Sequence, residues 1–402
     1  MFRSMCVGLG FAIAASSALG APLEGRIIKL KAGQQFSVNV PLSLSADGVE
    51  DGTRVKVVEP KTGKSFPSTV RGGELVFISE GAMPGTEHEY IVDPQGDAQV
   101  PFIVNLTPVE GKKAIDVRIA DEHFTTYHYS EEWKKPFLWP VNTEYGVGIT
   151  RDFPMGEKEI TGDHPHHKSM WVAYGALNGV DCWAEGENSG FQETVSVEHG
   201  SGDAYGWIRA KNVWTDKDHK PVISEEREYR FYASPANARL FDLTVTFTAD
   251  HGDVLWKDTK EGGIFAFRIR DSINGEHAGV MTLSDGQQKQ ENTWGKPAPW
   301  LDYSGEIADK GWAGISVFDN AANLRFPTRW HCRDYGLVGA NMFGLNDFTA
   351  GKENGDFTLK SGETITFKYR CLIHSGDVKQ GAVADRYADY ATPPSAAWAE
   401  SN

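Results

Sequence analysis

The chain has 402 residues and a formal net charge of -15 at pH 7. This length suits one large domain and a smaller one, because a single hydrophobic core rarely grows beyond about 250–300 residues. The acidic balance, with no local run of lysine and arginine, argues against nucleic acid or an anionic membrane as a partner, because little would neutralise phosphates.

The first twenty residues have the pattern of an export signal. Arg3 supplies a positive start, an apolar run follows over residues 7–15, and small residues suited to cleavage lie at 18–20. We therefore expect residues 1–20 to be a signal peptide and the mature protein to be periplasmic or secreted. No later segment is apolar enough to predict a membrane span.

Residues 21–110 are predicted to form a small β-domain. The stretches "GQQFSVNVPLSL" and "GELVFISE" alternate apolar and polar residues, and "PKTGKS" supplies a turn between them. The stretch contains no cluster of catalytic residue types. An immunoglobulin-like sandwich with a structural or adhesive role is the most economical interpretation.

Residues 111–392 are predicted to form a second, larger all-β domain. Runs such as "EEREYRFYA" and "RLFDLTVTFTA" alternate with period two and are rich in aromatic and β-branched residues. Only "DVKQGAVADRYADYA" near the C-terminus looks helical. So many strands favour a large β-supersandwich of two extended sheets. Its cysteines allow one disulfide bridge with one thiol left over, or three free thiols: Cys182, Cys332 and Cys371.

The segment 145–187 holds the main candidates for chemistry. Pro165 excludes a helix interior for "DHPHH", and in an extended chain His164 and His166 point one way while His167 points the other. One of these histidines, oriented by Asp163, could act as a general acid or base. A divalent metal held by His164 and His166, or by His167 alone, with distant ligands is possible, although no HExxH or CxxC motif accompanies them. A polar surface loop is the third reading. Candidate substrate-binding residues in this segment are Arg151, Asp152, Trp171, Asn178, Asp181 and Trp183.

Two further segments supply partners. In the stretch 327–344, His331 and Arg333 would share one face of a strand and could bind a carboxylate or polarise a carbonyl. Taken alone, an internal ion pair between Arg333 and Asp334 is the simpler interpretation. Glu261, in the turn "DTKEGG", is a candidate acid or base and Arg268 a candidate anion holder, although surface charge is the usual explanation. The remaining candidates for substrate binding are Trp330, Asp334 and Asn341.

Seven segments, in order, resemble an exported bacterial family that is labelled PmoA-like after a methane oxygenase subunit and is otherwise a domain of unknown function. They span about residues 113–375 and read "KPFLWPV", "ITRDFP", "DHPHHKSMW", "NGVDCW", "DTKEGG", "PWLDYSG" and "WHCRDYGLVGANMFG". Members are often found in bacteria that degrade polysaccharides, so the resemblance implies carbohydrate processing. Methane oxidation is not expected, because that oxygenase subunit is a membrane protein and this chain has no spanning segment.

The combination of a large sandwich with histidine, arginine and acidic residues among aromatic ones also resembles the galactose-mutarotase supersandwich. That architecture hosts epimerases, polysaccharide lyases and parts of glycosidases. The favoured hypothesis is an exported carbohydrate-active hydrolase or lyase that uses the candidate histidines, Asp163 and Glu261, with Trp171, Trp183 and Trp330 available to stack on sugar rings. Two alternatives stay open, a non-catalytic glycan-binding protein and a metal-dependent oxidoreductase. No cofactor is certain, and a divalent metal is possible.

Overall fold

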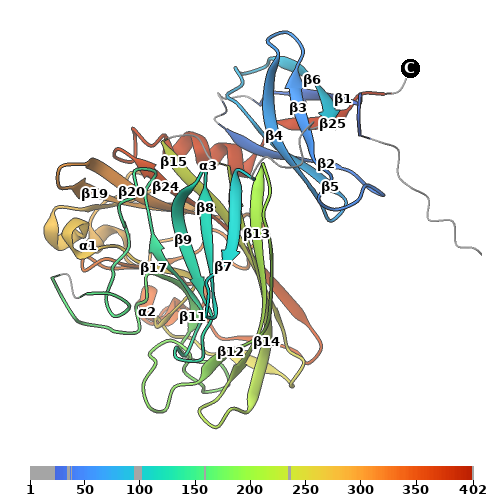
Figure 1. Ribbon diagram of the computed structural model, residues 1–402. Helices are drawn as coiled ribbons and strands as arrows, with labels where there is room; N and C mark the ends of the chain where they lie inside the picture. The colour runs from blue at the N-terminus through green and yellow to red at the C-terminus, as the bar shows by residue number, and fades with distance from the viewer. Residues whose placement is uncertain are drawn as a thin grey trace, which may run out of the picture.

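The computed structural model describes residues 23–33, 37, 39–94, 102–157, 160–233 and 237–400, so the expected signal peptide lies outside the described residues. These residues form a small and a large body, and the regular structure of both is mostly β-strand (Figure 1). The expected all-β class, with a small sandwich before a large one, is confirmed. No helix among the described residues is long and apolar enough to cross a membrane.

The small domain is one antiparallel set of seven strands in the order β2-β5-β4-β3-β6-β1-β25. The first half of β4 pairs with β3 and its second half with β5, so the strand bends between the two layers of the sandwich. Alternate residues of β2 (Val40, Leu42 and Leu44) point into the core, as their period-two pattern predicts. The strands are β1 (Ile27–Lys31), β2 (Val40–Ser45), β3 (Val55–Glu59), β4 (Lys64–Arg71), β5 (Glu74–Ser79), β6 (Glu87–Pro94) and β25 (Ser395–Trp398).

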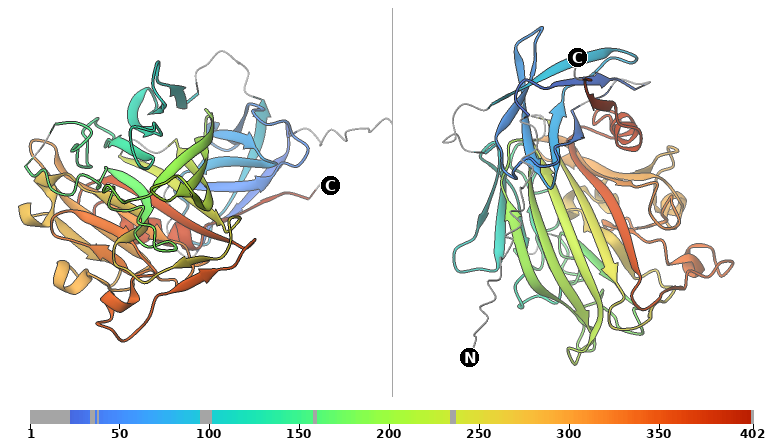
Figure 2. Two further views of the ribbon diagram at one scale, coloured as in Figure 1. Left: turned by 90° about the horizontal axis from the view of Figure 1, so that it is seen from below. Right: turned by 90° about the vertical axis from the view of Figure 1, so that its right-hand side faces the viewer.

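The large domain contains two eight-stranded sheets, whose long strands run side by side beneath the small domain (Figure 2). We call them the front sheet, in the order β21-β22-β17-β11-β10-β9-β8-β7, and the back sheet, in the order β12-β13-β14-β15-β24-β20-β19-β18. The front strands are β7 (Val104–Pro108), β8 (Ala114–Ile119), β9 (Glu122–His128), β10 (Phe137–Val141), β11 (Met170–Tyr174), β17 (Gly262–Arg268), β21 (Trp330–Cys332) and β22 (Leu337–Ala340).

The back sheet contains the longest strands, and a two-stranded pair and three short helices lie outside both large sheets. Its strands are β12 (Phe191–Gly200), β13 (Tyr205–Thr215), β14 (Pro221–Tyr232), β15 (Ala238–Thr248), β18 (Val280–Leu283), β19 (Trp300–Ile307), β20 (Gly311–Asp319) and β24 (Thr364–Ser375). A separate pair is formed by β16 (Val254–Trp256) and β23 (Phe357–Leu359). The helices are α1 (Gln290–Thr293), α2 (Leu345–Phe348) and α3 (Val383–Ala391), the last within the segment expected to be helical.

The domain division differs in detail from the expected ranges 21–110 and 111–392. Strand β7 was placed in the small domain by its sequence, but it pairs with β8 in the front sheet of the large domain. At the other end of the chain, β25 returns to the small domain and pairs with β1, so that Trp398 lies opposite Ile28. Figure 1 shows this red strand among the blue ones. The small domain is therefore built from both ends of the described chain.

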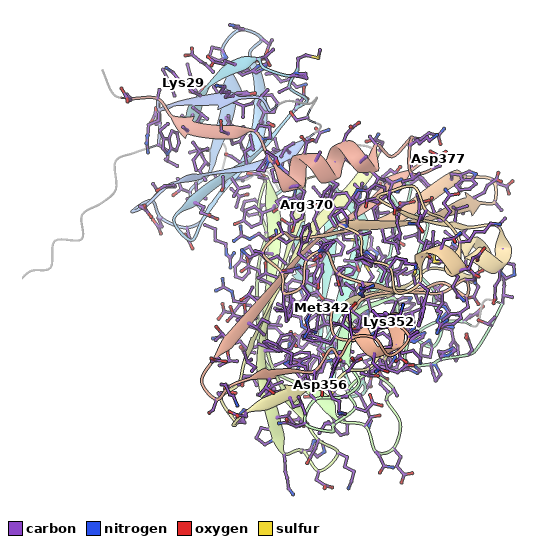
Figure 3. All side chains as sticks on the ribbon, turned by 180° about the vertical axis from the view of Figure 1, so that it is seen from behind. Lys29, Met342, Lys352, Asp356, Arg370 and Asp377 are labelled. Atoms are coloured by element: carbon purple, nitrogen blue, oxygen red, sulfur yellow. The ribbon has the colours of Figure 1, made fainter. Side chains whose placement is uncertain are left out.

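The core of the large domain lies between its two sheets. Side chains of the front sheet, such as Phe124 and Val172, belong to the same buried cluster as Phe241 and Val245 of the back sheet. The side chains drawn in Figure 3 fill this space. Burial of this apolar surface is the main driving force for the fold. The three cysteines of the large domain are buried and form no disulfide: Cys182, Cys332 and Cys371.

The small domain rests on the end of the large one through a mixed contact. Val76 and Ile78 of β5 pack in one cluster with Tyr205, Leu240 and residues of α3. Ion pairs reinforce this contact, with N–O distances of 2.9 Å for Arg54–Asp203, 3.1 Å for Arg71–Glu228 and 3.4 Å for Arg230–Glu74. Nearby, Arg370 lies 4.8 Å from the ring of Tyr390 in α3 (Figure 3). Apolar burial and charge together hold the two domains in contact.

Candidate functional site

The candidate site lies on the outer face of the front sheet, the face turned away from the back sheet. Partners opposite one another in an antiparallel ladder point to the same face of a sheet. The register therefore sets a cross-sheet row on the outer face, which runs over six strands as His331, Gly339, Ala266, Trp171, Phe137 and His128. Loops that follow β10, β11 and β21 cover this row and carry most of the candidate residues.

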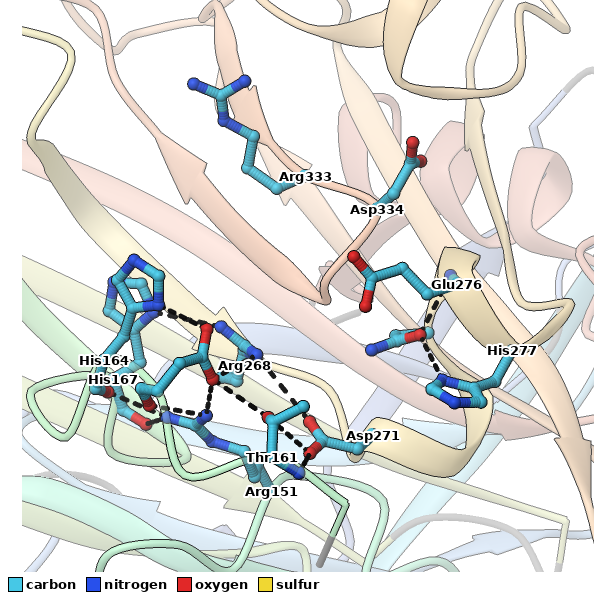
Figure 4. A network of polar contacts seen from close by, with 12 residues as sticks. Arg151, Thr161, His164, His167, Arg268, Asp271, Glu276, His277, Arg333 and Asp334 are labelled. Carbon is cyan, nitrogen blue, oxygen red and sulfur yellow. Dashed lines mark hydrogen bonds and ion pairs between the residues drawn. The ribbon is translucent and has the colours of Figure 1, made fainter.

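The loop between β10 and β11, residues 142–169, is called the covering loop below. Asp163 is its polar centre. Its Oδ1 atom accepts hydrogen bonds from Arg151 at 2.8 Å, from Arg268 at 3.1 Å and from the Thr161 hydroxyl at 2.9 Å (Figure 4). Both arginines are fully buried. Burial alone would raise the pKa of Asp163, but Arg268, His164 and Thr161 outweigh it and hold that pKa well below its usual value. Asp163 is therefore a fixed carboxylate.

His164 is held by this carboxylate. Its Nδ1 atom lies 2.5 Å from Oδ2 of Asp163. The ring lies parallel to two others, with centroids 4.8 Å from His167 and 5.1 Å from Tyr335. The side chain remains 41% exposed, and no described residue hydrogen-bonds its Nε2 atom. The ring is thus oriented by protein on one edge and open on the other.

The expected alternation of the three histidines is wrong, because "DHPHH" forms a turn. His164 has φ 44°, in the left-handed region, and the backbone N–H of His167 donates to the His164 carbonyl at 2.9 Å. This turn brings all three rings together, with His166 and His167 only 4.3 Å apart. We call His164, His166 and His167 with Asp163 the histidine cluster.

The two inner histidines are neutral at pH 7. Burial, followed by the nearby His166 and Arg268, lowers the pKa of His167 well below its usual value. Its Nδ1 atom lies 3.4 Å from a nitrogen of Arg268, from which it accepts. Burial and then Lys135 lower the pKa of His166 to about 3. His164 is therefore the member of the cluster that is placed to exchange protons with a ligand.

One carboxylate beside the cluster binds two buried lysines. Glu185 pairs with Lys135 through one oxygen and with Lys168 through the other. Burial alone would raise the pKa of Glu185, but the two lysines hold it below its usual value. Burial and then Lys135 lower the pKa of Lys168 to about 8. The carboxylate of Glu185 and the two lysine ammonium groups thus form ion pairs that hold the loops together.

Several predicted substrate-binding residues serve the fold instead. Asn178 binds the backbone of Asp253 and Leu255, and Asp181 accepts from the N–H groups of Trp183 and Ala184. Asn341 holds the turns around residues 259–260 and 343–344. Amide and carboxylate side chains in glycine-rich loops commonly satisfy backbone groups in this way.

The predicted stacking tryptophans are buried. Trp171 is 2% exposed, Trp183 is 1% exposed and Trp330 is 0% exposed, so none of them offers a ring face to a sugar. His167 lies over Trp171, and the Trp330 indole donates to the Ala298 carbonyl at 2.9 Å. The sequence placed them next to polar residues correctly, but it did not show that loops cover them.

The partners expected from the later segments are only partly in place. His331 is buried in the cross-sheet row, and burial followed by Arg333 lowers its pKa to about 3, so it is neutral. Glu261 is 45% exposed and pairs with Lys260. The expected Arg333–Asp334 ion pair is absent from the described residues. Arg333 instead lies over the Trp294 ring at 5.1 Å, with no carboxylate partner there. Figure 4 shows its guanidinium extended away from Asp334.

Asp152 accepts a hydrogen bond from the Trp139 indole at 3.0 Å, which ties the start of the covering loop to β10. Sequence reasoning left out Tyr335 and Lys135, and it considered Arg268 only as a possible anion holder. Arg268 ends a strand in "FAFRIR", and Tyr335 directly follows the Arg333–Asp334 pair, so both lay next to residues already under consideration. Lys135 carried no signal, because burial of a lysine is not visible in a single sequence.

Metal ligation was an open possibility for His164 and His166. Over the part of the chain that the structure describes, no group of three or more His, Cys, Asp or Glu side chains is arranged to hold a metal ion.

The fold and the site define an all-β protein in which a small sandwich is followed by a supersandwich with a histidine cluster on the outer face of one sheet. The chain belongs to DUF6807, a family of unknown function whose model matches residues 114–388. No curated protein sequence matches it.

Three solved structures are similar to this chain in part. They are a protein in the glycosyl hydrolase family 38 from Enterococcus faecalis (8% identity, TM-score 0.43), an alpha-mannosidase from Enterococcus faecalis V583 (8%, 0.40) and a galactose 1-epimerase from Lactobacillus acidophilus NCFM (7%, 0.33). They cover 94%, 94% and 69% of this chain, and 48%, 46% and 100% of their own. The chain thus spans about half the length of the first two.

Proposed function

We propose that this protein is an exported carbohydrate-active enzyme in which His164 exchanges a proton with the substrate. The observation that carries the proposal is the 2.5 Å contact between Nδ1 of His164 and Oδ2 of Asp163. A carboxylate bound at Nδ1 fixes the tautomer, so that Nε2 carries the free lone pair of a general base. Arg151 and Arg268 fix the carboxylate in turn.

A lyase reaction fits the site better than glycoside hydrolysis. Hydrolysis commonly needs one protonated carboxyl group beside a second carboxylate. The pKa values of Asp163 and Glu185 are both lowered by ion pairs, and Glu261 is paired with Lys260. A carboxyl group that serves as an acid near neutral pH instead needs a raised pKa. Asp163 and Glu185 are therefore poor proton donors, whereas His164 remains a suitable base.

Arg333 is suited to hold an acidic group of the substrate. It has no carboxylate partner among the described residues, and it lies two residues from Tyr335, which stacks on His164. A guanidinium binds a carboxylate well and stabilises the negative charge that develops when a neighbouring C–H bond is broken. We therefore infer that the substrate is a chain that contains uronic acid units.

The proposed step is a β-elimination. Nε2 of His164 takes the proton from the carbon next to the sugar carboxylate, which Arg333 neutralises. The C–H electron pair forms a carbon–carbon double bond, and the glycosidic oxygen on the next carbon leaves with its bonding pair and takes a proton from water. No oxidant or reductant is needed, and one sugar product is unsaturated.

The resemblance of seven segments to the exported PmoA-like family supports both a carbohydrate substrate and export. Members of that family are often found in bacteria that degrade polysaccharides, which is an association and not a mechanism. Direct analysis of the processed N-terminus in the periplasmic or secreted fraction tests export.

The test of function is turnover on a panel of uronic-acid polysaccharides, followed by the ultraviolet absorbance of the unsaturated product. We expect His164→Gln to lose about 10²–10⁴-fold in rate, while His251→Gln, an exposed histidine in the turn after β15, keeps full activity. New reducing ends without unsaturated product would show hydrolysis. Binding without turnover would favour a glycan-binding protein. A stoichiometric transition metal that is lost in His166→Ala would favour the oxidoreductase alternative.

A further inference from the structure

A hollow of about 530 Å³ lies on the outer face of the front sheet beside the histidine cluster. Its lining includes His128 and Phe137 of the cross-sheet row, next to Trp171, on which the cluster rests. Trp133, Trp139 and Met155 also line it, and Met155 belongs to the same covering loop as Asp163. The hollow and the cluster therefore share both a sheet and a loop.

The lining of this larger hollow combines aromatic faces with a defined acceptor. Nε2 of His128 lies 2.8 Å from the Trp139 carbonyl, an atom that can only accept, so Nε2 carries the hydrogen. Burial lowers the pKa of His128, which keeps the ring neutral and leaves Nδ1 as an acceptor. The ring also stacks on Phe137, with centroids 5.0 Å apart. A sugar ring offers the matching surface, with apolar C–H groups on its faces and hydroxyl donors on its edge.

A second hollow, of about 320 Å³, shares Ser130, Glu131 and Trp133 with the first. Its other walls include Phe191 and His219, whose rings stack at 4.6 Å. Trp133 thus borders both spaces, so that they form two neighbouring compartments.

Trp133 also connects this region to the candidate site. Its ring lies 5.1 Å from Nζ of Lys168, the residue that directly follows His167. It packs edge-on against Phe137, with centroids 5.5 Å apart. A ligand chain that extends from the histidine cluster along this face therefore passes Trp133, which borders both hollows.

We propose that the two hollows bordered by Trp133 bind successive sugar units of the substrate, so that the protein acts on an oligosaccharide or polysaccharide rather than on a monosaccharide. The proposal rests on the proposed function for the reaction at His164, but the binding that it assigns to the hollows does not require turnover. Volumes of about 530 and 320 Å³ suit ligands with many atoms each.

The test measures binding of size-fractionated oligouronides by titration calorimetry, with the His164→Gln variant used to prevent turnover. We expect affinity to rise with chain length and Trp133→Ala to weaken the binding of the longer chains about tenfold. Trp133→Phe should restore most of it. Trp312→Ala, in strand β20 of the back sheet, is the matched control and should bind normally. His128→Phe keeps a ring against Phe137 and removes the acceptor, so it answers the question if Trp133→Ala does not fold.

Equal affinity for monomer and long chains, or unchanged binding in both Trp133→Ala and His128→Phe, would overturn the proposal. The two proposals fail in different ways. Length-dependent binding that needs Trp133, without turnover by the unmodified protein, would reject the lyase reaction. It would keep the assignment of the two hollows to successive sugar units. Turnover that is independent of chain length and of Trp133 would keep the reaction and reject the assignment of the two hollows to successive sugar units.

Discussion

The imidazole of His167 lies parallel to the indole of Trp171, with ring centroids 5.4 Å apart and an angle of 15° between the planes. Trp171 belongs to strand β11 in the middle of the front sheet, whereas His167 belongs to the covering loop. On its other side His167 stacks on His164. A rigid strand thus orients the exposed histidine through one intervening ring, in keeping with the rule that accurate sites need supporting contacts.

This stack makes a prediction about positioning. His167→Ala removes the support of His164 and should lower kcat by about tenfold or more, with a smaller change in KM, because misplacement of a base affects the chemical step. His167→Phe retains a ring between Trp171 and His164 and should recover a large part of kcat. Steady-state kinetics on the substrate identified from the polysaccharide panel measures kcat and KM for both variants. Equal kcat values for the alanine and phenylalanine variants would contradict a positioning role.

The buried neutral histidines predict how stability depends on pH. Their folded-state pKa values lie below the ordinary value near 6.5, so the unfolded chain binds protons first as the pH falls. Their contribution to stability is complete above about pH 6.5. It is lost progressively as the pH falls from there toward the folded-state value, which is about 3 for His331. Each such histidine removes up to about 1.4 kcal/mol per pH unit.

Urea unfolding between about pH 7.5 and 4.5 measures this slope. His331→Gln should make this slope shallower by about one proton. Burial raises the pKa of Asp319 to about 6, which acts with the opposite sign in part of this range. Comparison of variants removes that contribution, because Asp319 is present in all of them. An unchanged slope in His331→Gln would show that this histidine is not buried as a neutral group.

Glu185 should be essential for the stability of the loops around the site. Glu185→Gln leaves the buried Lys135 and Lys168 without their carboxylate, and loss of one partner of a buried ion pair costs about 3–5 kcal/mol. The control is Glu261→Gln, which breaks a largely exposed pair with Lys260 and should cost less than about 1 kcal/mol. Denaturant titration measures both. Similar losses for the two variants would contradict the contrast in burial.

Removal of strand β25 should destabilise the small domain selectively. Truncation after Pro394 exposes the edge of β1 and removes the Trp398 indole, which donates to the Ser45 carbonyl at 2.7 Å and packs under Arg26. We expect a new, earlier transition in thermal unfolding and faster proteolysis within residues 23–94, while the large domain keeps its own transition. A single unshifted transition would show that β25 adds nothing to the stability of the small domain.

Much of the fold followed from local pattern. Alternation with period two predicted the strands, as in β14, where Ile223 and Tyr229 point inward and Ser224 and Arg230 do not. The assignment of β7 and β25 did not follow, because pairing between distant segments is decided by which edge remains open and not by the sequence of the strand itself. Sequence order therefore predicted two domains but not which of them contains each terminal strand.

For the candidate site, the sequence brought attention to the loop that contains His164 and Asp163, and the structure places these two side chains in contact. It failed for the geometry of the three histidines, because the left-handed conformation of His164 reverses the direction of the chain. It also failed for Trp171 and Trp183, because a strand pattern shows that a side chain leaves the sheet but not whether a loop lies over it. Arg268 was missed as the second anchor of Asp163, since it lies 105 residues away in the chain.

The return of β25 to the small domain also sets an order for biosynthesis. A ribosome makes β1 near the start and its partner β25 only after the whole supersandwich. The first domain to be translated can therefore be the last to be completed. Until then the open edge of β1 is available for pairing with other chains, an exposure that chaperones or rapid folding of the rest of the protein would need to limit.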